Sequence, residues 1–165
     1  MLSGLPGAGK TTLAEHLARN HGLAVVSRDT IRTALFDPCL FTPAEKFAAF
    51  EALLIAVRTL AHENRGLIVE GMPFSRPGEL EAVRDELVAA DRTATFIHLA
   101  LPPEVAAQRI RGARQAGDRM APDRDETLPR AVADRFRALP SWVSTIDATQ
   151  ERSSIQRAAE TLLAS

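Results

Sequence analysis

The sequence predicts an α/β fold, a three-layer sandwich in which one five-stranded parallel sheet is covered by helices on both faces. Five short apolar runs alternate with longer segments whose apolar residues recur at three- and four-residue spacing. That alternation is typical of parallel strands joined by helices, with right-handed crossovers. A glycine-rich loop also separates the first apolar run from the first helical segment, which fits a strand, a tight turn and a helix in that order.

Length, composition and charge are those of one ordinary globular domain. The 165 residues allow a single domain, residues 1–165, with a sizeable core. The net charge of −1 argues against broad nonspecific binding to nucleic acid, although a local basic patch is compatible with it. The single cysteine, Cys39, excludes an internal disulfide, and no apolar run reaches the roughly 18 residues of a membrane span. We therefore expect a cytoplasmic protein without a signal peptide or membrane contact.

The first half of the chain predicts three strands and three helices. Residues 1–3 are short for a central strand, so we expect either that the chain starts too late or that the fold tolerates a stub. Gly22 ends the first helix, and Thr42 and Pro43 begin the third. The predicted elements are a strand at 1–3, a helix at 10–20, a strand at 23–26, a helix that begins near Asp29, a helix at 43–64 and a strand at 67–69.

The second half predicts two more strands, the helices between them and a small lid. Residues 94–101 form the longest apolar run of the sheet, and Pro103 suits the first turn of the next helix. The apolar pattern then fades around Gly117 and Pro122, which predicts a mobile lid at about residues 109–127. The other predicted elements are helices at 80–90 and 129–139, a strand at 142–146 and a final amphipathic helix.

The glycine-rich loop carries the strongest functional signal. Residues 4–12 fit G-x-x-x-x-G-K-[ST], a loop that binds nucleotide phosphates between a strand and a helix. Its glycines let backbone N–H groups point at phosphate oxygens, and the following helix adds its positive dipole end. Lys10 would reach the β and γ phosphates of ATP, and the Thr11 hydroxyl would hold Mg²⁺. The predicted nucleotide contacts are Gly4, Pro6, Gly7, Ala8, Gly9, Lys10, Thr11 and Thr12.

Three charged residues follow the second and third predicted strands, at the sheet edge where open α/β folds bind ligands. Asp29 could orient or deprotonate a hydroxyl that attacks the γ-phosphate, bind Mg²⁺ through water, or cap a helix. Arg32 could grip an anionic acceptor or be a solvated charge. Glu70 could assist Mg²⁺, cap a helix or pair with an arginine.

Arginines and phenylalanines supply the remaining candidates. Phosphoryl transfer builds negative charge on the transferring group, and a lid arginine can neutralise it. We expect one or two of five arginines to do so. The phenylalanines that flank the acceptor-side loops are mostly core residues by their spacing, although one or two could line an acceptor pocket, and Phe74 is our candidate for an acceptor contact. These phenylalanines are Phe36, Phe41, Phe47, Phe50 and Phe74. The five arginines are Arg109, Arg111, Arg114, Arg119 and Arg124.

Two stretches together, residues 4–12 and Ser27-Arg28-Asp29-x-x-Arg32, resemble a family of small phosphate-loop kinases. This is the group around polynucleotide 5′-kinase and the zeta-toxin-like kinases, which have an AAA-type ATP-binding domain. The resemblance covers most of the chain and implies a phosphate-loop NTPase fold like that of nucleoside and nucleotide kinases. It also implies that Asp29 is the base that activates the acceptor hydroxyl and that Arg32 contacts an acceptor anion.

The resemblance implies further roles in the second half of the chain. Arg114 and Arg109 look like lid arginines on the transferring phosphate. Arg111 looks like a residue that stacks on adenine, beside a loop that carries Asp147 and Thr149. The third strand ends in Glu70, where such kinases more often have Asp, so the Mg²⁺ role of this residue departs from the family pattern.

These observations predict an ATP- and Mg²⁺-dependent kinase that phosphorylates a hydroxyl group of a small molecule or a nucleotide. One alternative is a 5′-OH polynucleotide kinase, because near-neutral charge allows a grip on one or two end nucleotides but not a long groove. Another is a binding or switch module that uses ATP hydrolysis as its timer. Neither the acceptor nor an oligomeric state is predicted.

Overall fold

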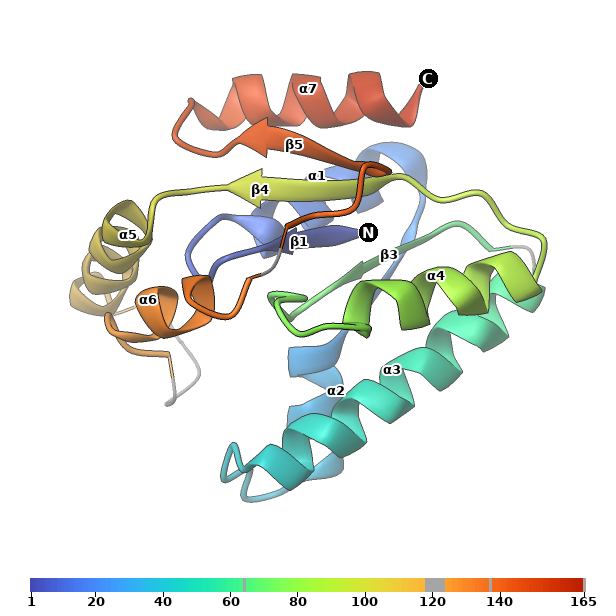
Figure 1. Ribbon diagram of the computed structural model, residues 1–165, viewed down its shortest axis with the longest axis horizontal. Coiled ribbons are helices and arrows are strands. Elements are labelled where there is room, and N and C mark those ends of the chain that lie inside the picture. The colour runs from blue at the N-terminus through green and yellow to red at the C-terminus, as the bar shows by residue number, and fades with distance from the viewer. Residues whose placement is uncertain (64, 118–123, 137, 165) are drawn as a thin grey trace.

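The computed structural model of the chain describes residues 1–63, 65–117, 124–136 and 138–164, and strands alternate with helices along it (Figure 1). Its elements are β1 (Leu2–Gly4), α1 (Lys10–His21), β2 (Ala24–Ser27), α2 (Arg28–Leu35), α3 (Pro43–His62), β3 (Leu67–Glu70), α4 (Glu79–Ala89), β4 (Phe96–Ala100), α5 (Pro103–Gln115), α6 (Leu128–Ala133), β5 (Val143–Asp147) and α7 (Arg152–Leu163).

The strands are parallel, but they form two sheets of three and two strands, so the prediction of one five-stranded sheet is wrong. The first sheet has the order β1-β4-β5, and the second pairs β2 with β3. The short β1 lies beside β3 and makes a backbone hydrogen bond to the segment after β3, from the Gly4 N–H to the Pro73 carbonyl at 3.2 Å. Pro73 lies beyond the turn at Gly71, whose φ is 87°. Because the chain has already turned there, the two strands do not continue into a ladder.

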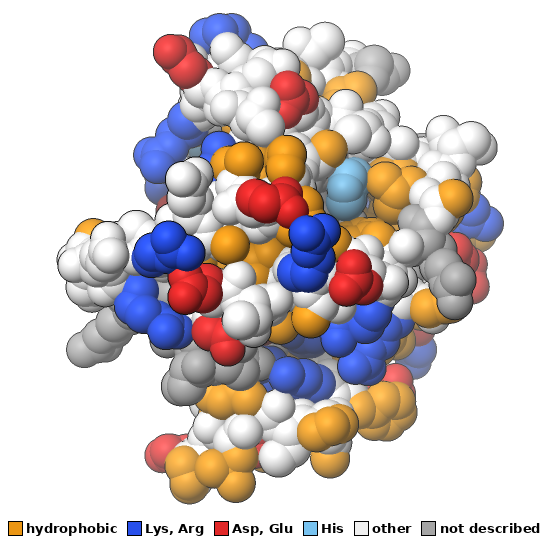
Figure 2. All heavy atoms as spheres, turned by 60° about the vertical axis from the view of Figure 1, so that its left-hand side comes forward, with side chains coloured by type: hydrophobic (Ala, Val, Ile, Leu, Met, Phe, Trp, Pro, Cys, Tyr) orange, Lys and Arg blue, Asp and Glu red, His pale blue; other side chains and the backbone are white. Residues whose placement is uncertain are grey.

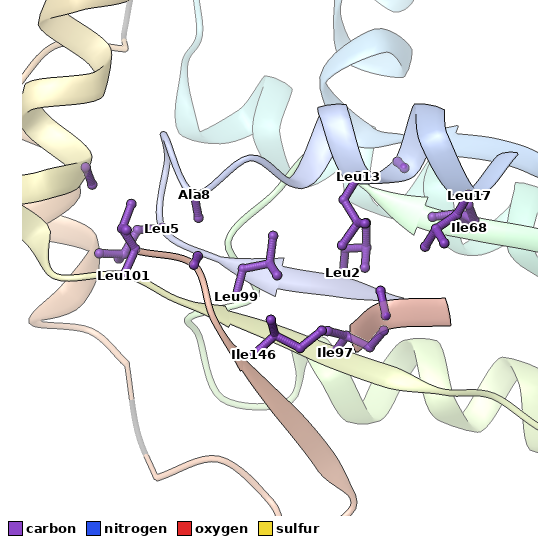
Figure 3. Close-up of a cluster of buried hydrophobic side chains, with 14 of the residues drawn as sticks. Leu2, Leu5, Ala8, Leu13, Leu17, Ile68, Ile97, Leu99, Leu101 and Ile146 are labelled. Carbon is purple, nitrogen blue, oxygen red and sulfur yellow. The ribbon is translucent and has the colours of Figure 1, made fainter. Parts of the chain in front are cut away.

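Helices cover both faces of the strands, as the α/β prediction required. Along β3 and β4 the buried side chains alternate between two cores, because successive strand residues point to opposite faces. Ile68 and Ile97 belong to the core beneath α1 and α7, where Leu13 lies against Leu2 (Figure 3). Val69 and Phe96 belong to the core beneath α3 and α4.

The boundaries of most predicted elements agree with the structure to within a few residues. The helix predicted at 129–139 is shorter, because the N–H groups of Arg135 and Phe136 bond to carbonyls three residues back, as in a closing turn. Helix α3 begins with a capping box in which Thr42 and Glu45 bond each other's backbone. No helix in the described part of the chain is long and apolar enough to span a bilayer.

The predicted lid falls partly outside the described residues. Residues 109–115 continue α5, and residues 118–123 are not described. The arrows of β4 and β5 point toward the side where α5 lies (Figure 1). The carboxyl ends of these strands therefore open toward that side, which is the edge where ligands bind in such sheets.

Candidate active site

The carboxyl ends of the strands open into a cavity of about 720 Å³. Figure 2 views this side of the molecule and shows Lys and Arg side chains gathered with Asp and Glu side chains across its middle. The cavity brings together the loop after β1, the start of α2 and the end of β3. The predicted site residues that line it are Pro6, Gly7, Gly9, Lys10, Thr11, Thr12, Asp29, Arg32, Glu70, Arg109 and Arg124.

The loop between β1 and α1 has the conformation that its glycines allow. Gly7 and Gly9 have φ of 86° and 91°, a region that disfavours a side chain. Gly9 is the N-cap of α1 and has no side chain to occupy the first N–H groups, so the positive end of the helix is open to an anion. Lys10 Nζ donates to the carbonyls of Gly4 and Leu5 at 2.8 and 2.9 Å.

The Lys10 ammonium is buried among charges of both signs. Burial lowers its pKa to about 8, and the Arg124 and Arg28 cations act in the same direction, whereas Glu70 and Asp29 oppose the shift. A buried cation with two cationic neighbours is stabilised when an anion enters the cavity. The site is therefore electrostatically suited to phosphate.

A buried carboxylate faces the phosphate loop from β3. Thr11 Oγ1 donates to Glu70 Oε2 at 3.0 Å, and Glu70 is only 3% exposed. A hydroxyl and a carboxylate at the phosphate end of a cavity are hard oxygen ligands, the kind that Mg²⁺ binds together with substrate phosphates. The two residues therefore fit the ion that the sequence predicts here.

Gly71 joins the end of β3 to the start of α2. A Cβ at Gly71 would lie 2.5 Å from Ser27 Oγ, 2.7 Å from the Arg28 nitrogen and 2.9 Å from the Asp29 nitrogen. The φ of 87° disfavours a side chain as well. The glycine thus lets the chain after Glu70 pass directly against the first turn of α2.

Asp29 is held by arginines rather than acting as a helix cap. Ser27 is the N-cap of α2, and Asp29 lies in the first turn. Asp29 Oδ1 lies 3.2 Å from Arg28 Nη2 and 3.3 Å from Arg32 Nη2. Arg32 is 2% exposed and stacks over the ring of Phe41 at 4.3 Å, so the interpretation of Arg32 as a solvated charge is wrong.

The two arginines beside Asp29 keep unused donors. In the part of the chain that the structure describes, the buried side-chain nitrogen and oxygen atoms without a hydrogen-bond partner are Arg28 Nε and Arg32 Nε. Burying a charged donor without a partner is costly. Both residues line the cavity. Their Nε atoms are closed to solvent, so a ligand anion would reach these donors only after a shift of the side chains.

Among the lid arginines that the structure describes, Arg124 contacts Asp29. Its Nη2 donates to Asp29 Oδ2 at 3.1 Å, and its side chain lines the cavity. Arg114 is exposed, lies off the cavity lining and donates to the backbone carbonyl of Arg124 at 2.9 Å. Arg119 lies outside the described residues.

A second, smaller cavity of about 310 Å³ adjoins the outer side of the phosphate loop. Ala8 lines it, together with Arg109, Arg152, Gln150 and Ile155. Arg109 also lines the main cavity and donates to the Ala148 carbonyl at 2.8 Å. This cavity lies where a nucleoside attached to loop-bound phosphates could extend.

The other residues predicted near adenine lie outside the linings of both cavities. Arg111 pairs with Glu126 at 2.6 Å on the exposed side of α5. Asp147 accepts from the Thr149 hydroxyl at 2.7 Å and the Thr149 N–H at 2.9 Å, and these bonds lower the pKa of Asp147. Asp147 and Thr149 thus shape the turn that leads to Gln150.

The structure places Phe74 in the core instead of at the cavity. Phe74 is 2% exposed and packs beneath α3 and α4, because the chain after β3 turns its side chain inward. The phenylalanines on the cavity lining are Phe47 and Phe50 of α3, and Phe47 is 66% exposed.

Sequence reasoning missed Arg28 and Arg152, whereas Phe47 was among the phenylalanines considered for an acceptor pocket. Arg28 is adjacent to Asp29, so the same strand-end argument applies to it. Arg152 is the first residue of α7, directly after the fifth strand and its turn. Phe47 belongs to a helical apolar stripe, and the sequence carries no signal that separates it from core residues.

A family of AAA domains, AAA_33, matches residues 1–139. No curated protein sequence matches the chain. Solved structures share its fold at low identity. A “putative kinase” from Chloroflexus aurantiacus is 22% identical with a TM-score of 0.73, covering 99% of this chain and 94% of its own. A sugar kinase from Janibacter sp. is 20% identical, with a TM-score of 0.73 and coverages of 99% and 92%. A gluconokinase from Sinorhizobium meliloti is 18% identical, with a TM-score of 0.70 and coverages of 99% and 89%.

Proposed function

We propose that this chain, which belongs to the AAA domain family AAA_33, transfers the γ-phosphate of ATP to a hydroxyl group of a small molecule or nucleotide. The observation that carries the proposal is one cavity with two chemically different sides. On one side lie the phosphate loop and Lys10, and on the other lies Asp29 with two arginines. A hydrolase or a switch needs the first side and a residue that orients water, but not the arginines that would hold an acceptor.

The loop side suits the phosphates of ATP. The N–H groups at the start of α1 and the Lys10 ammonium supply donors and positive charge for the β and γ phosphates. Thr11 and Glu70 would hold Mg²⁺, which neutralises charge on the phosphate oxygens when it is bound. The base of ATP fits the smaller cavity beside Arg109 and Gln150.

Asp29 supplies the base for the transfer. The acceptor hydroxyl oxygen forms a bond to the γ-phosphorus, and the bond from that phosphorus to the bridging oxygen breaks, which releases ADP. The hydroxyl proton passes to the Asp29 carboxylate. Lys10 stabilises the charge that develops on the transferring group.

The acceptor side suits a molecule that carries an anionic group. Arg28 and Arg32 line this side of the cavity, and their guanidinium groups would bind a carboxylate or phosphate of the acceptor. Phe47 and Phe50 offer an apolar wall on α3. Two solved structures of this fold are named sugar kinase and gluconokinase, so sugars and sugar acids are the first acceptors to test.

The test is a transfer assay with radiolabelled γ-phosphate across a panel of sugars, sugar acids, nucleosides and nucleotides. Asp29→Asn keeps the shape of the side chain but removes the basic oxygen, so we expect transfer to fall by about a hundredfold or more while ATP binding is retained. Transfer at a rate near that of the parent protein would refute Asp29 as the base. Hydrolysis of ATP without transfer to any acceptor would favour the switch function.

A 5′-OH polynucleotide kinase is the second candidate, and two features favour it. An exposed aromatic ring, Phe47, can stack on a base, and the paired arginines can bind a backbone phosphate. Labelling of a 5′-OH oligonucleotide with a low KM would select this function over a small-molecule kinase. Labelling that needs millimolar oligonucleotide, while a sugar acid is used efficiently, would exclude it.

A further inference from the structure

The two carboxylate oxygens of Asp29 have different partners. Oδ1 faces Arg28 and Arg32, which belong to the same helix as Asp29. Oδ2 accepts from Arg124, which lies 95 residues away along the chain. The local arginines thus orient the carboxylate, and the distant arginine covers its second oxygen.

Arg124 lies between the two sides of the cavity. It contacts Asp29 on the acceptor side, and after burial it is the charged neighbour that most lowers the pKa of Lys10 on the phosphate side. Its side chain is 34% exposed and Asp29 is 28% exposed, so the ion pair is partly open to water. Ion pairs that are open to water contribute little to stability, so a stronger anion can compete for Arg124.

We propose that Arg124 is the arginine that contacts the γ-phosphate of ATP, and that until ATP binds it covers the oxygen of Asp29 that takes the acceptor proton. The inference rests on the proposed kinase function. A γ-phosphate beside Lys10 carries more negative charge than one carboxylate and binds an arginine through two parallel bonds. When Arg124 moves to the phosphate, Oδ2 becomes free to accept a proton from the acceptor hydroxyl.

Arg114 then has a positioning role. Its guanidinium donates to the Arg124 carbonyl at 2.9 Å and lies off the cavity lining. It holds the backbone of Arg124 in place without reaching the phosphates. The resemblance implied that Arg114 contacts the transferring phosphate, and we assign that contact to Arg124 instead.

The experiment compares the affinities for ADP and for AMP-PNP, a non-hydrolysable ATP analogue, in the presence of Mg²⁺. Arg124→Ala should weaken AMP-PNP binding by about tenfold and leave ADP binding nearly unchanged, because only the triphosphate has the γ group. Arg130→Ala is the matched control, since Arg130 pairs with Glu104 in an exposed position. Equal losses for both nucleotides, or none, would overturn the proposal.

A double-mutant cycle tests the exchange itself. Asp29→Asn removes the competitor for Arg124, so AMP-PNP should bind several-fold more tightly than to the parent protein. The gain should disappear in the Arg124→Ala background. A gain of equal size in both backgrounds would mean that Asp29 acts only through its charge, and the proposal would fail.

Two further measurements keep the outcomes distinct. Arg124→Lys keeps the charge and should restore part of the preference for AMP-PNP over ADP, and circular dichroism verifies that each variant is folded. If the parent protein binds neither nucleotide, the proposed function fails. If both bind and no acceptor is phosphorylated, the comparison of affinities still decides the role of Arg124.

Discussion

Lys10 shows how burial prepares a residue for its ligand. Its lowered pKa, about 8, means that the ammonium loses its proton just above neutral pH in the free protein. Bound phosphates favour the charged form and raise the pKa again. Nucleotide affinity should therefore be highest below pH 8 and should fall as pH rises through that value.

We predict that the affinity for AMP-PNP falls by up to about tenfold per pH unit above pH 8, and that binding there takes up a proton. The charged groups that face Lys10 are Arg124, Arg28, Glu70 and Asp29. Calorimetry in two buffers of different ionisation enthalpy measures the uptake. Lys10→Met should bind weakly at every pH and show no such fall; an unchanged pH profile in this variant would assign the titration to another group.

At the scale of elements, the site depends on one close contact between β3 and α2. The chain after Glu70 passes so near Ser27 and Arg28 that Gly71 cannot carry a side chain without a shift. This contact sets the distance between the Glu70 carboxylate and the Asp29 carboxylate. A change at Gly71 should therefore affect both stability and transfer.

Gly71→Ala should lower the free energy of unfolding by about 1–3 kcal/mol and reduce transfer by tenfold or more, because the first turn of α2 must move. Urea unfolding followed by Trp142 fluorescence and the transfer assay measure the two effects. Gly112→Ala is the control, because its Cβ meets no described atom within 4 Å and alanine favours the helix by about 1 kcal/mol. Similar stability in both variants would contradict the steric argument.

At the scale of the whole molecule, the candidate site spans both sheets. The phosphate loop follows β1 of the three-stranded sheet, whereas Asp29 follows β2 and Glu70 ends β3 of the two-stranded sheet. A nucleotide bound with Mg²⁺ would contact groups from both. Binding should therefore stabilise the fold as a whole.

We predict that AMP-PNP with Mg²⁺ at about 100 times its Kd raises the free energy of unfolding by about 2.7 kcal/mol, which corresponds to roughly 5–10 °C in Tm. Removal of Mg²⁺ with EDTA should reduce the shift, because Thr11 and Glu70 then lose the ion between them and the phosphates. Differential scanning fluorimetry measures both. An equal shift with AMP, which lacks the β and γ phosphates, would place the nucleotide away from the loop.

Local sequence patterns were enough to predict most of the fold. The alternation of apolar runs and helical spacing predicted every described strand and helix in order, and the predicted bounds agree to within a few residues except at the shortened helix α6. The loop at 4–12 is one continuous stretch. Asp29 and Arg32 are close in sequence as well, three residues apart on one helix. Groups this close in sequence are brought together by local backbone geometry alone.

Long-range packing decided the rest. The split between the sheets follows from the turn at Gly71, and the burial of Phe74 follows from how that turn directs the chain. Among the described lid arginines, which look alike in the sequence, the fold brought Arg124 to Asp29, 95 residues away. The sequence by itself determined the elements and the phosphate loop, because both depend on neighbouring residues. Only the tertiary structure decided which distant side chains share the cavity, because that depends on how the elements pack.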